Sequence, residues 1–178
     1  MKLVYPFTTG ETPELAQVGG KAMSLITMTQ HSLPVPPGFA LTVAFFEPWL
    51  EYIQNTPEWG RALNSSPEDL KQNTIAVEDL CRGLELDDAH REVVAKALES
   101  LKANGKTPLL AVRSSSPEED LEGLSFAGGY ETVLGVKEET LEDALRRSFA
   151  SCFEVAEPIK TPLLPARSCA YPMRRCSS

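Results

Sequence analysis

Apolar residues recur at helical spacing in several stretches of the chain, with short apolar runs between them. Helical spacing predicts helices that bury one face, and short apolar or alternating runs predict strands. The pattern predicts helices after Gly20, Thr42, Ser66, Asp87 and Thr140, and strands near residues 3–5, 39–41, 109–112 and 130–136. This mixture of strands and helices predicts an α+β (mixed α/β) fold. No internal repeat is present.

Prolines and glycines mark where several of these elements end. The helix after Gly20 must end before Pro34, which opens a stiff extended connector up to Gly38. Pro48 is expected to kink the helix that follows Thr42 or to delay its start.

The chain changes character from Pro158 onward. Residues 158–178 hold four of the 14 prolines and four basic residues but no acidic one. A change this abrupt indicates a linker, a tail or translation in the wrong reading frame. We therefore expect a domain at residues 1–157, followed at 158–178 by a Pro/Arg/Cys-rich tail that is non-native or unstructured.

Length, charge and cysteine spacing narrow the class of protein. A chain of 178 residues with 42% apolar residues is expected to form one globular domain. Its net charge of −8 disfavours binding to nucleic acid or to an anionic membrane, and no apolar run approaches the roughly 20 residues that span a bilayer. The four cysteines form no C-x-x-C pair, which favours a reduced cytoplasmic protein.

The first candidate for chemistry is Gly19-Gly20-Lys21, at a predicted helix start. Exposed backbone amides and the helix dipole favour an anion there, and the lysine adds a mobile positive charge. The segment is not a Walker A loop, which would need glycine at Leu15 and Ser or Thr at Ala22. An ordinary loop-to-helix junction is the alternative interpretation.

The second candidate is Arg113-Ser114-Ser115, where a predicted strand ends. A guanidinium at a strand end can bind phosphate oxygens through two hydrogen bonds, and the serines could add further donors. The alternative is an arginine paired with one of the acidic residues that follow, and serines that cap a turn.

The third candidate is the glycine-rich segment from Ser125 to Thr132. Glycines allow a backbone to approach a ligand closely, although a plain hairpin turn would also use them. Two glycine elements and an arginine at a strand end, taken together, favour a site for nucleotide phosphates.

Four segments, taken in order, resemble one family. They are residues 18–21, 34–39, 111–115 and 125–132, which look like the N-terminal ATP-binding, ATP-grasp-type domain of the phosphoenolpyruvate synthase and pyruvate phosphate dikinase family. The resemblance covers about residues 3–153 and implies ATP and Mg²⁺ as ligands. It assigns the ATP phosphates to Lys21, Arg113, Gly128, Gly129 and Thr132, with secondary contacts at Ser114, Ser115 and Glu131. It identifies no catalytic residue and no metal ligand in this chain.

The resemblance also implies a reaction. Complete relatives convert ATP, pyruvate and water into phosphoenolpyruvate, AMP and phosphate, through a histidine on a separate domain. Residues 1–157 match only part of the ATP-binding domain, so a truncated or frameshifted fragment that is inactive alone is expected. Two alternatives stay open: a module of a rifampicin or other small-molecule phosphotransferase, and a noncatalytic part that complements a separate chain.

Overall fold

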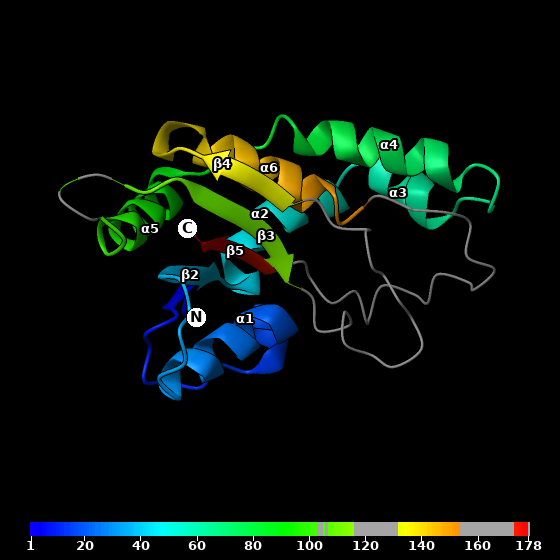
Figure 1. Cartoon of the computed structure of the whole chain (residues 1–178). Helices are drawn as coiled ribbons and strands as arrows, with labels where there is room; N and C mark the ends of the chain where they lie inside the picture. Colours follow the sequence, from blue (N-terminus) through cyan, green and yellow to red (C-terminus); the bar gives the residue numbers. More distant parts are fainter. Residues whose placement is uncertain (103–104, 106, 116–131, 154–172, 178) are drawn as a thin grey trace.

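A computed structural model describes residues 1–102, 105, 107–115, 132–153 and 173–177. The strands of these residues form one antiparallel sheet in the order β1-β2-β5-β3-β4 (Figure 1). Their bounds are β1 Val4–Pro6, β2 Gly38–Leu41, β3 Leu110–Ser115, β4 Thr132–Val136 and β5 Met173–Ser177.

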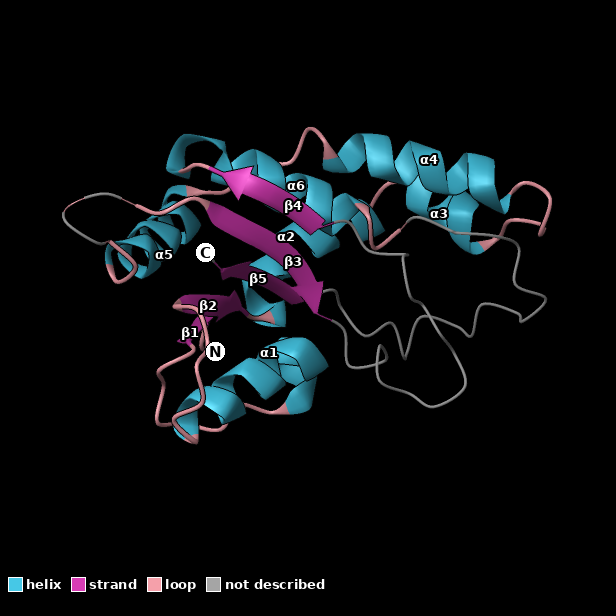
Figure 2. Cartoon of the chain, in the orientation of Figure 1, coloured by secondary structure: helices cyan, strands magenta, loops and turns pink. Residues whose placement is uncertain are grey.

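Helices cover both faces of this sheet, as Figure 2 shows. Their bounds are α1 Leu15–Gln30, α2 Val43–Gln54, α3 Pro57–Leu63, α4 Leu70–Cys81, α5 Asp88–Glu99 and α6 Leu141–Ala150, with a 3-10 turn at Glu138–Thr140. Side chains alternate along β2, so Ala40 packs with α1 while Phe39 and Leu41 join the larger core formed with α2 to α6. The strands thus lie between α1 and most of the larger core, and α1 also meets the start of α2, where Val43 packs against its cluster.

Aromatic rings fill the centre of the larger core. Phe149 of α6 stacks on Phe46 with ring centroids 5.7 Å apart, and it meets Trp49 edge to face at 5.4 Å. Phe153 continues the cluster toward Trp59 of α3. These contacts join α2, α3 and α6 into one layer.

The mixed α/β fold predicted from the sequence is confirmed, with corrections to single elements. Helix α2 begins at Val43 and includes Pro48, so the delayed start is wrong. Helix α4 begins at Leu70, later than Ser66 predicted, and α3 is an additional helix that the apolar pattern did not predict.

Strand β3 is longer than predicted and continues through Ser115. Arg113 therefore lies inside this strand and not at its end. The cause is pairing with neighbouring strands, because β4 pairs with β3 as far as Arg113 and β5 pairs with it as far as Ser115, which holds the polar end extended.

The C-terminal segment also differs from the expectation in part. We predicted no element in residues 158–178, whereas residues 173–177 form β5 between β2 and β3. Residues 158–172 and 178 lie outside the described residues.

Candidate functional site

A kink at Gly19 divides α1 into two helical pieces. Gly19 has φ 72° and ψ 167°, a conformation that is almost exclusive to glycine. A Cβ atom at this position would lie 2.5 Å from the carbonyl oxygen of Ser115 and 2.6 Å from its hydroxyl oxygen. The glycine therefore lets the start of α1 rest directly on the end of β3.

A hydrogen bond joins the same two segments. The backbone amide of Ala22 donates to the Ser115 hydroxyl oxygen over 3.1 Å, and both residues are fully buried. The first amides of a helix have no partner within that helix, so amides that follow a kink need acceptors from elsewhere. Ser115, 93 residues away in sequence, supplies this acceptor.

The contact brings Lys21 and Arg113 onto neighbouring segments. Lys21 directly precedes Ala22 and is half-buried. Arg113 is exposed and lies two residues before Ser115 in β3. Because side chains alternate along a strand, Arg113 and Ser115 lie on the same face of β3, the one that meets α1. In Figure 1 the kinked end of α1 lies next to the arrowhead of β3.

Two further predicted residues lie on the strands beside this contact. Thr132 of β4 is exposed and pairs in register with Arg113, which places both at one position across the sheet. Ser114 is buried and alternates to the opposite face of β3, where Val112 joins the larger core. The structure thus brings Thr132 close to Arg113 and separates Ser114 from α1.

The predicted glycine-rich segment cannot be placed in this geometry. Gly128, Gly129 and Glu131 lie outside the described residues. One part of the site was not predicted from the sequence: the hydrogen bond from the Ala22 amide to the Ser115 hydroxyl. The Gly-Gly pair was a usable signal, because glycine tolerates backbone conformations that other residues avoid, but nothing in the sequence indicated the residue that contacts it.

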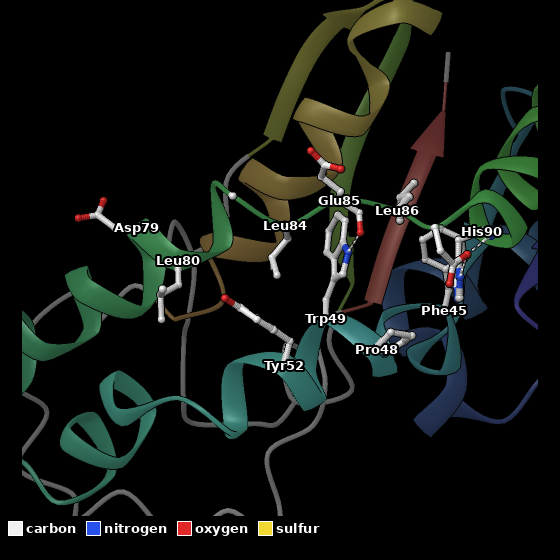
Figure 3. A pocket seen from close by; sticks show the side chains of 12 residues that line it. Phe45, Pro48, Trp49, Tyr52, Asp79, Leu80, Leu84, Glu85, Leu86 and His90 are labelled. Carbon is white, nitrogen blue, oxygen red and sulfur yellow. Dashed lines mark hydrogen bonds and ion pairs between the residues drawn. The ribbon is translucent and has the colours of Figure 1, made fainter.

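A groove of about 630 Å³ lies on the other side of the molecule, between α2 and the connection from α4 to α5 (Figure 3). Several polar groups that line it form hydrogen bonds within the protein. The Trp49 indole N–H donates to the carbonyl oxygen of Glu85 over 2.8 Å. Backbone and ring hydrogen bonds from His90 keep the pKa of Asp87 below its usual value, and this carboxylate caps α5. Among the described residues, none of those predicted to bind phosphate lines this groove.

The described residues meet neither the requirements of a metal site nor those of a membrane-spanning helix. There, no three His, Cys, Asp or Glu side chains group closely enough to hold a metal ion. Of the helices that the structure describes, none combines the length and apolar character that a membrane crossing requires.

Comparison with known proteins decides the family. Residues 15–156 match the family model described as the AMP/ATP-binding domain of pyruvate phosphate dikinase. The chain belongs to this family. The match includes α1 with its Gly19 kink, β3, and the segment between β3 and β4, so it spans every residue that the sequence analysis proposed for phosphate binding.

Proteins similar to this chain carry several names. A phosphoenolpyruvate synthase of Aeropyrum pernix is 30% identical over 77% of this chain. The uncharacterized phosphotransferase YvkC of Bacillus subtilis is 35% identical over 80%, and the prodigiosin synthesizing transferase PigC of Serratia marcescens is 32% identical over 85%. The chain spans only 18%, 15% and 15% of these three relatives.

Proposed function

We propose that this chain binds ATP through its triphosphate at the junction of α1 and β3. The observation that carries the proposal is the contact of Gly19 and Ala22 with Ser115, because it holds the backbone next to Lys21 against the strand that bears Arg113. Two cationic side chains on adjoining segments suit a polyphosphate. Membership of an AMP/ATP-binding domain family supports the same ligand.

Each proposed residue has a separate role at the phosphates. The Arg113 guanidinium can bind two oxygens at once, whereas the Lys21 ammonium acts as a mobile point charge. The helix that resumes after Gly19 has the positive end of its dipole at this junction, which favours an anion, while its Ala22 amide is already bonded to Ser115. Thr132 offers a hydroxyl beside Arg113. We assign the segment with Gly128, Gly129 and Glu131 to the same site, as in an ATP-grasp-type fold.

Magnesium is the usual counterion of a transferred phosphate. We expect it to accompany ATP, held mainly by the phosphates with one or two carboxylates, and the described residues contain no group of three His, Cys, Asp or Glu side chains that would hold a metal ion alone. Among the described residues, the groups proposed to contact the ATP phosphates are the Lys21 and Arg113 side chains and the Thr132 hydroxyl, with the helix dipole after Gly19.

We further propose that the isolated chain binds ATP without turnover. It spans at most about a fifth of its relatives, and transfer to pyruvate needs an acceptor site that the described residues do not show. The relatives' names include a synthase and two transferases, so the acceptor is expected to come from another domain or a separate chain. We place the ATP-binding chain in the cytoplasm, because its four cysteines form no C-x-x-C pair, a usage that favours a reduced compartment.

Isothermal titration with ATP tests the binding site. Lys21→Met and Arg113→Ala should each weaken ATP binding by about tenfold or more, because each removes a charge-assisted contact to phosphate. Lys96→Met and Arg82→Ala are matched controls, since both side chains are exposed and lie on α5 and at the end of α4. Unchanged affinity in Lys21→Met or Arg113→Ala would remove that residue from the site.

A second assay tests the absence of turnover. The purified chain is incubated with Mg·ATP and pyruvate, and AMP is measured over time. No sustained AMP release is expected, and sustained release would show that the chain catalyses the reaction alone.

A further inference from the structure

The hydroxyl of Ser115 has a role that differs from the phosphate contact suggested by the sequence. It accepts the Ala22 amide hydrogen bond at 3.1 Å, at a place where both residues are fully shielded from solvent. Water cannot replace a lost partner at such a place, so this amide depends on the serine.

The junction around this hydrogen bond has little room to move. The position of a Gly19 Cβ would be within 2.6 Å of three Ser115 atoms, which shows how closely the two backbones approach. A shift of α1 along or away from β3 would break the bond or cause a clash. The separation of the two segments is therefore fixed at one value.

We propose that Ser115 is a positioning residue that sets the place of Lys21 relative to Arg113 through the Ala22 amide. This inference rests on the proposed ATP site. Ser115 lies on the strand that carries Arg113, and its hydrogen-bond partner directly follows Lys21 in sequence. The Ser115 hydroxyl therefore fixes the position of Lys21 relative to the strand that carries Arg113. Loss of this hydroxyl should weaken ATP binding because Lys21 is then displaced.

A double-mutant cycle on the full chain tests this dependence. ATP affinity is measured by titration for the wild type, Ser115→Ala, Lys21→Met and the double variant. Ser115→Ala alone should weaken ATP binding by about tenfold, but by less than about twofold when Lys21 is already Met. A direct contact of Ser115 with phosphate would instead weaken binding in both backgrounds.

The control variant is Ser151→Ala. It removes a different buried hydroxyl, which donates a 2.9 Å hydrogen bond to the backbone carbonyl of Ser148. It should lower thermal stability without changing ATP affinity. If circular dichroism shows that Ser115→Ala is unfolded, the cycle uses Ser115→Cys, which keeps the shape of the side chain but accepts hydrogen bonds weakly.

The outcomes separate the two proposals. Equal losses for the Ser115 variant in both Lys21 backgrounds, or no loss at all, overturn the positioning role. If the positioning role is overturned but Lys21→Met still weakens ATP binding, the proposed ATP site is retained without a role for Ser115. If the wild type does not bind ATP, the proposed function fails and the positioning role fails with it.

Discussion

The backbone of Gly19 combines two demands that only glycine meets. Its φ of 72° with ψ of 167° is strained for any residue with a side chain, and the carbonyl of Ser115 occupies the space of a Cβ. The kink and the contact with β3 therefore depend on this one position.

Gly19→Ala should destabilise the fold by about 3 kcal/mol, because it adds backbone strain and a steric clash in a buried junction. Chemical denaturation measures the change. Gly60→Ala is the control, since Gly60 lies in α3 with nothing within 4 Å of its Cβ position and should gain slightly from helix propensity. Equal stability of the wild type and Gly19→Ala would show that α1 can move away from β3.

The sequence predicted part of this junction. Two adjacent glycines before a lysine predicted a helix that starts after Gly20, where the second piece of α1 resumes, but neither the kink at Gly19 nor the first piece from Leu15 was predicted. The partner could not be predicted, because Ser115 is distant in sequence and its hydroxyl reads equally well as a turn cap or a phosphate donor. The roles of Lys21, Arg113 and Thr132 at the phosphates stay predictions.

At the scale of elements, Glu142 connects α6 to α5 and to the segment before it. Its carboxylate accepts the Leu86 amide at 2.9 Å and the Arg91 guanidinium at 3.2 and 3.3 Å. Burial alone would raise the pKa of Glu142, but these hydrogen bonds and the nearby charges of Arg91 and Arg146 bring it below the ordinary 4.5.

Glu142→Gln should lower the free energy of unfolding by about 1 kcal/mol at neutral pH. The lowered pKa gives the sign: the carboxylate stabilises the fold above its unfolded pKa, and this contribution disappears as pH falls through the folded pKa. Denaturation at a series of pH values should therefore show the two proteins converging below about pH 4.

Glu139→Gln is the control for this series, because Glu139 is exposed and its ion pair with exposed Lys137 is long, at 3.7 Å. It should change stability little at any pH. A pH-independent gap between the wild type and Glu142→Gln would contradict the electrostatic explanation.

Helices with clear apolar periodicity were predicted best. Asp87 caps α5 by accepting the His90 amide, and Thr140 lies at the start of α6, as the sequence indicated. Helix α3 was missed because it is only seven residues long and has one buried residue, although Thr56 followed by Pro57 is a common helix start. The extent of β3 depended on its partner strands, which an apolar pattern does not reveal.

At the scale of the whole molecule, β4 forms one edge of the sheet. Leu134 in this strand is 72% exposed, and Leu109 just before β3 is 61% exposed. An edge strand with exposed apolar side chains can pair with another chain, which favours self-association.

Leu134→Lys should reduce self-association, because charge on an edge strand opposes pairing. Sedimentation velocity over a range of concentrations measures the effect. Leu63→Lys is the control: this leucine is likewise exposed, at 48%, but lies at the end of α3, away from the sheet edge. An equal reduction in both variants would assign the association to general hydrophobicity and not to β4.

The position of the tryptophans has a practical consequence. Both tryptophans of the chain, Trp49 and Trp59, belong to the helical layer that the sheet separates from α1. Tryptophan emission should therefore change when that layer unfolds. It should change little when a nucleotide binds at the proposed site on the opposite face. A tryptophan introduced at exposed Met28, near the end of α1, would provide an optical probe on that face.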